Sequence, residues 1–320
     1  MKRRRWLTPA VTVCCGIVSA HLAAQAGRPS ATALEMTAYR AIGAKHPDPS
    51  IRNGDRLAER LLGPEERAIL KETGADAVIA AMALDTEPAW ASLGTRGGLA
   101  RAVHVRTRLI DDVLEQSLRT GTRQVVILGA GLDSRAYRFD DVIENARVFE
   151  LDLPQTQRYK RDRIVDVLGR LPDHVAYVPI DFTKQDLGEV LRGAGYDQKM
   201  KALFIWEGVT MYIPEAAVDS TLRFVAGNAA PGSVIVFDYF LERALQKPTA
   251  DLKNTADRVA AVGEPFVFGM PGEDATAFVK QRGLAVASDV GYGELGLHYL
   301  PKGNNLPVRS VNRICTAVVP

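Results

Sequence analysis

The stretch QVVILGAGLDSRAYRFDDVIENARVFELD, residues 124–152, decides the fold of this chain. Its apolar run 125–128 is typical of a strand buried on both faces, and the run ends at Gly129-Ala130-Gly131. Two glycines let the backbone turn tightly and let a ligand approach without meeting a Cβ atom. Roughly twenty residues later, a second apolar patch ends in carboxylates at Glu150 and Asp152. This spacing predicts a nucleoside-binding βαβ unit, in which an acid accepts hydrogen bonds from two ribose hydroxyls.

The glycine pattern also indicates which nucleoside fits. A dinucleotide fingerprint places a third glycine where this chain has Ser134, and Asp133 puts a negative charge where a pyrophosphate would lie. A ligand with a ribose and no phosphate fits better. S-adenosyl-L-methionine (SAM) is such a ligand, and acidic side chains favour its sulfonium cation. The alternative interpretation is a turn with a purely structural role.

Composition sets the class of protein. The 320 residues are 47% hydrophobic and 24% charged, which indicates a soluble globular chain that is long enough for one large α/β domain. The net charge is only +2, and four positive charges lie in the first five residues, so we expect no nucleic-acid partner. Three cysteines (Cys14, Cys15 and Cys315) and five scattered histidines predict neither a disulfide framework nor a metal site.

Residues 1–26 resemble a secretory signal. They comprise a basic MKRRR, an apolar stretch around 11–22, and Ala24-Gln25-Ala26 as a small-x-small cleavage site. An N-terminal anchor and an extension from a miscalled start are the alternatives, and membrane contact is expected only if the segment is retained. SAM is made in the cytosol, so a cytoplasmic location is expected, with a periplasmic or secreted location as the alternative.

Helical periodicity dominates the region before the glycine turn. Apolar residues recur at helical spacing through 30–84, and this stretch is expected either to cover the ligand as a lid or to pack on the sheet edge. Thr95–Leu99 is predicted to be a loop, followed by a helix over 100–118. The first half of that helix contains three arginines, Arg101, Arg106 and Arg108. One of them could bind a ligand carboxylate through two parallel hydrogen bonds.

Strands and helices alternate after Asp152. Strands are predicted at 175–180, 202–206 and 234–239, and helices at 154–168 and 214–226. This alternation is typical of an open, mostly parallel sheet that binds ligands at the carboxyl ends of its strands. Asp152, Asp181 and Glu207 all fall at such ends, so we expect them to share one site. Asp181 could instead only cap the following turn.

The tail contains weaker signals. It is predicted to hold an irregular segment over 243–271, a helix over 274–282, a strand over 284–290, a loop over 291–296 and a final strand over 312–319. Its aromatic residues could line a substrate pocket or pack in the core.

Four segments together resemble one family. VVILGAGLDSRAYRF, FELDLPQTQRYKRDRI, YVPIDF and FIWEGVTMYIPE are similar to the leucine carboxyl methyltransferase family, in particular its bacterial branch of SAM-dependent methyltransferases. The resemblance implies a class I SAM-dependent methyltransferase fold, Rossmann-like, with a seven-stranded sheet whose last strand is antiparallel. It also implies the site. Gly129 and Gly131 would pass under SAM, Asp152 would bind the ribose, Asp181 and Phe182 would contact the adenine, and Glu207 would lie by the methionine moiety. Either Arg101 or Arg106 would bind the SAM carboxylate, and Arg106 is favoured.

These observations lead to one domain and one favoured function. Residues 27–320 are predicted to form a single domain: a helical lid and lead-in (27–120), a SAM-binding core (121–240), and a substrate-side insertion with the final strands (241–320). The favoured function is O-methylation of a small molecule or a carboxylate, without metal. Tyr212 and Arg135 are candidates for the acceptor side, although Tyr212 could be a packed aromatic and Arg135 an ion-pair partner of Asp133 or Asp140. No catalytic base is predicted, because a carboxylate acceptor has no proton to lose.

Two other functions stay open at this point. The first is an NAD-type oxidoreductase, which Ser134 and the lack of a hydride-transfer set disfavour. The second is a protein of the same fold that binds a nucleoside without turnover.

Overall fold

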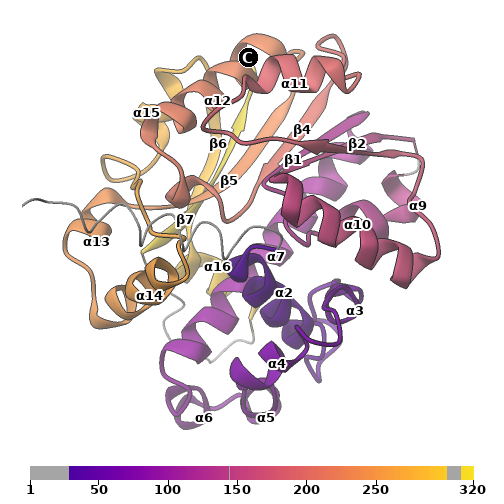
Figure 1. Cartoon of the computed structure of the whole chain (residues 1–320). Coiled ribbons are helices and arrows are strands. Elements are labelled where there is room, and N and C mark those ends of the chain that lie inside the picture. Colours follow the sequence, from indigo (N-terminus) through magenta and orange to yellow (C-terminus); the bar gives the residue numbers. More distant parts are fainter. Residues whose placement is uncertain (1–28, 144, 301–310) are drawn as a thin grey trace, which may run out of the picture.

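The computed structural model describes residues 29–143, 145–300 and 311–320, so the signal-like segment 1–26 lies outside the described residues. One sheet of seven strands forms the centre of the protein, in the order β3-β2-β1-β4-β5-β7-β6 (Figure 1). The strands are β1 (Gln124–Leu128), β2 (Arg147–Asp152), β3 (Val175–Pro179), β4 (Ala202–Trp206), β5 (Val234–Phe240), β6 (Ala285–Gly291) and β7 (Asn312–Val318). Each predicted strand is confirmed to within a few residues.

Strand direction also matches the expectation. β1 to β5 pair in parallel, and β7 pairs antiparallel with both β5 and β6. β1 lies between β2 and β4, and all five of its residues are buried, which agrees with its uninterrupted apolar run. The order reverses beside β1, because the chain first adds β2 and β3 on one side and then β4 on the other. A switch point of this kind is where parallel sheets bind ligands.

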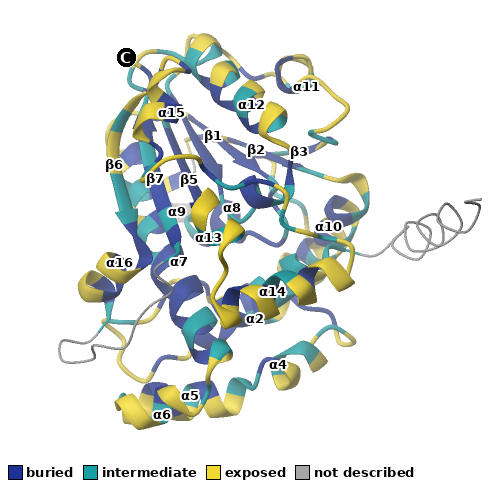
Figure 2. Ribbon diagram, turned by 90° about the vertical axis from the view of Figure 1, so that its left-hand side faces the viewer, coloured by how far each residue is buried: buried dark blue, intermediate teal, exposed yellow. Residues whose placement is uncertain are grey.

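Helices cover both faces of the sheet, and the strands between them are buried (Figures 1 and 2). One face packs against α11 (Leu187–Gly193), α12 (Glu215–Asn228) and α15 (Thr276–Lys280). The other packs against α7 (Thr95–Arg119), α8 (Arg135–Arg138), α9 (Asp140–Ile143), α10 (Pro154–Leu168) and α16 (Tyr292–Tyr299). The sheet and its two helical layers therefore form a three-layer α/β/α structure, which agrees with the predicted α/β fold with a mostly parallel sheet.

The N-terminal helices form a separate cluster beside the sheet (Figure 1). They are α2 (Ala31–Gly43), α3 (Ala58–Leu61), α4 (Ala68–Glu72), α5 (Ala75–Leu84) and α6 (Glu87–Ala91). α2 begins at Ser30, whose hydroxyl accepts a hydrogen bond from the N–H of Ala33 at 3.1 Å. Buried side chains of α2, α5, α6 and the start of α7 make up one apolar cluster. This cluster holds α2 against α7.

Two loop predictions, at 95–99 and 291–296, were wrong. Residues 95–99 begin α7 despite their two glycines. Gly97 is buried there, and a Cβ atom on it would lie 3.1 Å from the Trp90 carbonyl oxygen. Residues 292–299 form α16, where Tyr292, Leu295 and Tyr299 are buried at helical spacing and the intervening glycines hid that spacing.

The tail segment 243–271 is not irregular throughout. It contains α13 (Glu242–Gln246) and α14 (Ala250–Ala261). α14 begins at Thr249, which caps the N–H of Leu252, and it buries Leu252, Thr255 and Val259 along one face. α14 lies beside α2 in both views (Figures 1 and 2), and an ion pair links the two helices. Among the described residues, none of the helices combines the length and apolar character needed to cross a bilayer.

Candidate cofactor and acceptor site

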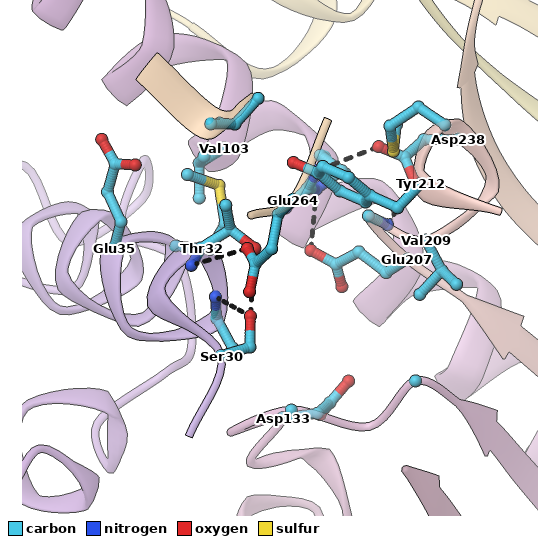
Figure 3. Close-up of a pocket in the computed structure, with 18 of the residues that line it drawn as sticks. Ser30, Thr32, Glu35, Val103, Asp133, Glu207, Val209, Tyr212, Asp238 and Glu264 are labelled. Atoms are coloured by element: carbon cyan, nitrogen blue, oxygen red, sulfur yellow. Dashed lines mark hydrogen bonds and ion pairs between the residues drawn. The ribbon is translucent and has the colours of Figure 1, made fainter. Parts of the chain in front are cut away.

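A cavity of about 360 Å³ lies at the carboxyl ends of β1, β2 and β4. Its volume falls in the range of small-molecule pockets. Gly129, Gly131, Asp152, Asp181, Phe182 and Glu207 line its sheet side. Residues of α2, α7, α14 and the loop after α14 line the other side, as Figure 3 shows for Thr32, Val103 and Glu264. The three acids predicted to share a site therefore do line a single cavity.

The glycine turn forms the base of this cavity. Gly129 has φ +67°, and a Cβ atom on it would lie 2.3 Å from the Cγ2 atom of Val209, so no side chain fits there. The second glycine of the turn, Gly131, donates its backbone N–H to the Oδ2 atom of Asp152 at 2.5 Å. The turn between β1 and α8 is thereby fixed to the end of β2.

Asp152 is half-buried at the edge of the cavity. Its Oδ1 atom accepts a second backbone hydrogen bond, from the N–H of Leu153 at 2.6 Å. Burial raises the pKa of Asp152, while the hydrogen bonds from Gly131 and Leu153 favour the ionised form and oppose that rise. Both oxygens also keep lone pairs free for further donors, as ribose recognition requires.

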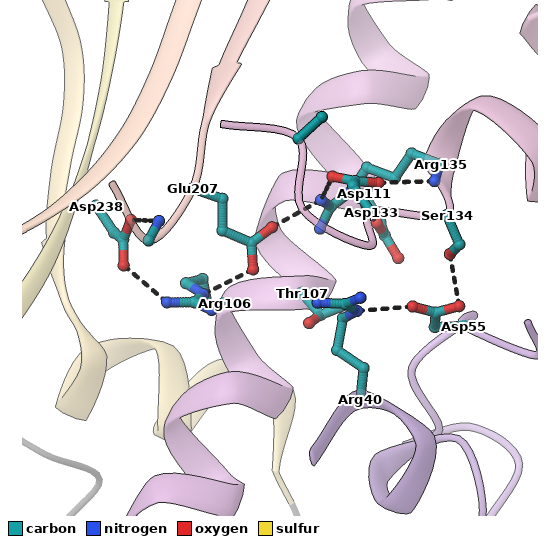
Figure 4. Close-up of polar contacts among 12 residues, drawn as sticks. Arg40, Asp55, Arg106, Thr107, Asp111, Asp133, Ser134, Arg135, Glu207 and Asp238 are labelled. Carbon is teal, nitrogen blue, oxygen red and sulfur yellow. Dashed lines mark hydrogen bonds and ion pairs between the residues drawn. The ribbon is translucent and has the colours of Figure 1, made fainter. Parts of the chain in front are cut away.

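Glu207 lies between two buried arginines (Figure 4). Its Oε1 atom is 2.7 Å from Nε of Arg106, and its Oε2 atom is 2.7 Å from an Nη atom of Arg135. Burial would raise the pKa of Glu207, but the two positive charges outweigh it and hold the pKa well below its usual range. The carboxylate is therefore ionised at neutral pH.

Arg135 stands behind Glu207 and is not among the residues that line the cavity. It also pairs with Asp133 at 2.5 Å and with Asp111 at 2.8 Å. Of the two roles considered for Arg135, its contacts therefore match the ion-pair alternative.

The two candidate arginines of α7 lie in different places. Arg106 lines the cavity, where it also donates to Asp238 at 2.9 Å. Arg101 lies in a separate, water-sized cavity, with its guanidinium 5.0 Å from the ring centre of Trp90. Of the two, Arg106 is thus the one placed to reach a ligand in the main cavity.

Asp181 and Phe182 line the cavity next to the end of β3. Asp181 accepts hydrogen bonds from the N–H and the hydroxyl of Thr183 and pairs with Lys184 at 2.7 Å. Burial would raise the pKa of Asp181, but the hydrogen bonds from Lys184 and Thr183 give a net lowering. Asp181 therefore caps the following turn, which was the alternative role predicted for it, and it also lines the cavity.

Tyr212 lines the cavity near its aromatic wall. Its ring centre lies 5.4 Å from that of Phe266, which itself lies 4.9 Å from that of Phe240. Burial, together with the nearby negative charge of Glu264, raises the pKa of the Tyr212 hydroxyl. Tyr212 is therefore a neutral phenol at physiological pH.

Asp238 is a site residue that the sequence analysis missed. It is fully buried on β5 and accepts hydrogen bonds from Arg106, from the N–H of Gly208 at 2.5 Å and from the hydroxyl of Tyr292 at 3.1 Å. A carboxylate inside the apolar run VIVFDYF was the available signal, because a buried strand tolerates such a charge only when it is paired.

The wall opposite the sheet was also missed. Glu264 accepts a hydrogen bond from the N–H of Thr32 at 3.2 Å, and Glu35 pairs with Arg258 at 2.5 Å. These contacts join α2 to α14 and its following loop, more than 200 residues apart in the chain. No local pattern marks such pairs. Across the described ranges, no cluster of three metal-ligating side chains is found.

Comparison with known proteins gives a consistent result. The sequence model of the family "Leucine carboxyl methyltransferase" matches residues 33–226. A Bacillus subtilis protein named "Putative S-adenosyl-L-methionine-dependent methyltransferase YktD" is 33% identical over 188 residues, which cover 57% of this chain and 60% of that protein. A Mycolicibacterium smegmatis protein with the same general name is 30% identical over 214 residues, covering 67% of this chain and 68% of that one.

A Streptomyces coelicolor relative is 36% identical over 163 residues, which cover 51% of its length. The match with this chain therefore spans about half to two thirds of the length of these three relatives. Among solved structures, a DUF574 family protein from Streptomyces avermitilis is similar with a TM-score of 0.49 and 16% identity, covering 87% of this chain and all of that one.

Proposed function

This chain belongs to the leucine carboxyl methyltransferase family, and from that premise we propose that it is a SAM-dependent methyltransferase that methylates an oxygen atom of a small molecule or a carboxylate. The observation that carries the proposal is the shared cavity above the glycine turn. Asp152, Asp181 and Glu207 come from three different strand ends and still line one cavity. Acids at the carboxyl ends of parallel strands that face one cavity are the arrangement expected of a nucleoside site.

The residues present fit SAM in shape and charge. The glycine turn presents backbone to the base of the cavity, because Gly129 leaves no room for a Cβ atom. Asp152 is proposed to accept the two ribose hydroxyls, with Gly131 passing under the nucleoside. Asp181 and Phe182 are proposed to hold the adenine. Glu207 and Arg106 are proposed to hold the amino and carboxylate groups of the methionine moiety, because they present opposite charges side by side.

Methyl transfer mainly requires that the acceptor oxygen be aligned with the S–CH3 bond. Bound SAM supplies a methyl group on a sulfonium, and transfer leaves a neutral thioether. The task of this chain is to fix the sulfonium and to place an acceptor oxygen in line with the S–CH3 bond. The buried network of Arg106, Glu207 and Arg135 suits that task, because each member is held by at least two partners.

Calorimetry on the full chain tests the proposal. SAM and S-adenosylhomocysteine are expected to bind and NAD is not, because Asp133 and Ser134 replace the features that receive a pyrophosphate. Binding of NAD in place of SAM would overturn the proposal in favour of an oxidoreductase. Turnover with methyl-labelled SAM against hydroxyl and carboxylate acceptors separates an enzyme from a protein that only binds the nucleoside.

A further inference from the structure

The charges around the cavity are unbalanced. Among the described residues, seven carboxylates line it: Glu35, Asp133, Asp152, Asp181, Glu207, Asp238 and Glu264. Only three guanidinium groups do so (Arg40, Arg106 and Arg258), and no lysine or histidine appears among these lining residues. Arg135 pairs with Asp133 and Glu207, and Lys184 pairs with Asp181, so part of this excess is balanced from outside the lining. The remaining negative charge favours the cationic sulfonium over an anionic acceptor.

Each of the three arginines is already paired. Arg40 pairs with Asp55 at 2.8 Å, and Arg258 pairs with Glu35 at 2.5 Å. Arg106 is held by two carboxylates, as described above. An acceptor carboxylate would therefore meet guanidinium groups whose positive charge is already balanced by protein carboxylates, which weakens their attraction for a further anion.

Glu264 differs from most acids of the cavity. Among the described residues no cation pairs with it, and it accepts a hydrogen bond from the backbone N–H of Thr32. It is half-buried and points to the wall where Thr32 and Tyr212 lie (Figure 3). A carboxylate oriented by one neutral donor retains lone pairs for a ligand.

Aromatic side chains line the cavity on the side of Glu264, whose negative charge acts on the Tyr212 hydroxyl. Tyr212, Phe240 and Phe266 form consecutive ring contacts, and Met36, Val103 and Met211 also line the cavity. Such a wall stacks a flat, uncharged ring. The one uncommitted acid of this wall therefore stands where a polar group of that ring would need a partner.

We infer that the methyl acceptor is an uncharged aromatic compound with a phenol-type hydroxyl, and that Glu264 accepts the hydroxyl proton. This inference rests on the proposed function and narrows it. As the acceptor oxygen forms its bond to the methyl carbon, its proton passes to a Glu264 carboxylate oxygen. The S–CH3 bond breaks, and its electron pair stays on sulfur. The proton then leaves Glu264 for water.

Binding of a matched probe pair tests the acceptor class. The full chain is saturated with S-adenosylhomocysteine and titrated at pH 7 with 2-naphthol and with 2-naphthoate, which share a ring system. The first is neutral, since a phenol has a pKa of about 10, and the second is an anion, since a carboxylic acid has a pKa of about 4. We expect 2-naphthol to bind at least about tenfold more tightly, a gap of about 1.4 kcal/mol. Equal or tighter binding of 2-naphthoate overturns the inference, and so does absence of 2-naphthol binding.

A variant tests the role of Glu264. Glu264→Gln keeps an oxygen for the Thr32 N–H but cannot take a proton, so kcat on the best phenol of a panel is expected to fall about 100-fold with the KM for SAM unchanged. The lost rate should return toward pH 10, where the acceptor ionises in solution. The exposed Glu72→Gln serves as the matched control. An unchanged kcat in Glu264→Gln overturns the role.

The two proposals fail in different ways. If S-adenosylhomocysteine does not bind the wild-type chain, the methyltransferase function itself is wrong. If it binds and the naphthoate is preferred, only the acceptor class and the role of Glu264 are wrong.

Discussion

The backbone N–H of Gly131 donates to the Oδ2 atom of Asp152 at 2.5 Å, so the glycine turn after β1 and the acid at the end of β2 form one unit. The acid is thereby oriented before any ligand arrives. A preoriented acceptor loses less entropy on binding, which is why the two features are useful as a pair.

Asp152→Ala is expected to abolish detectable binding of SAM and S-adenosylhomocysteine. The substitution removes the proposed ribose acceptor and leaves the N–H groups of Gly131 and Leu153 without their carboxylate. Calorimetry measures the loss, and a thermal melt verifies that the variant folds. Asp173→Ala, on a side chain that is 97% exposed, is the control. Retained affinity in Asp152→Ala would remove Asp152 from the site.

Gly129→Ala is expected to destabilise the protein by about 1–3 kcal/mol more than Gly121→Ala. Both glycines have positive φ values, +67° and +96°, so both variants carry backbone strain. Only at Gly129 does the new Cβ atom also meet Val209, at 2.3 Å, whereas nothing lies within 4 Å at Gly121. Urea unfolding gives both free energies. An equal decrease in the free energy of unfolding of the two variants would show that the close approach to Val209 does not contribute to the destabilisation.

Glu207→Gln is expected to lower the free energy of unfolding by about 3 kcal/mol, because it leaves Arg106 and Arg135 buried without their shared charge. The exposed pair Glu115 and Arg119 provides the comparison, and Glu115→Gln should cost about 0.5 kcal/mol or less.

The stabilisation by Glu207 should also depend on pH. Since the folded state depresses the pKa of Glu207, its contribution to the free energy of unfolding is present above a pH of about 4 and is lost on further acidification. A urea series over pH measures both effects.

Acid should also destabilise the protein through His104. Burial lowers the pKa of His104 from 6.5 to about 4, and its Nε2 atom contacts the Ile51 carbonyl oxygen at 2.8 Å. Between these pH values the unfolded chain binds a proton that the folded chain excludes, so stability falls by about 3 kcal/mol as the pH drops from 6.5 to 4.

His104→Gln should flatten that part of the stability profile, since glutamine does not titrate. Burial also lowers the pKa of the neighbouring His46, so a smaller slope of the same sign should persist. An unchanged slope in His104→Gln would contradict the assignment.

The compartment is best tested on the whole chain. We propose a cytoplasmic location, because SAM is made there, with export of a chain cleaved near Ala26 as the alternative. Cell fractionation of a C-terminally tagged chain, followed by N-terminal sequencing, gives the answer. Tagged protein in the periplasm with a new N-terminus at Gly27 would contradict the cytoplasmic proposal.

The sequence by itself determined the sheet and the position of the ligand site. Short apolar runs buried on both faces, a glycine turn and acids at strand ends are local signals, and parallel strands bring their carboxyl ends to one edge. Where glycines interrupted the apolar spacing, in the predicted loops 95–99 and 291–296, the local signal failed because these segments belong largely to the helices α7 and α16.

Only the tertiary structure decided which side chains complete the site. Arg101 and Arg106 differ by five positions, about 140° around a helix, so packing of α7 determines which one faces the cavity. Asp238 joins Arg106 across 132 residues, and Glu264 joins Thr32 across 232 residues. Contacts at such separations depend on how the layers pack, and no periodicity along the chain encodes them.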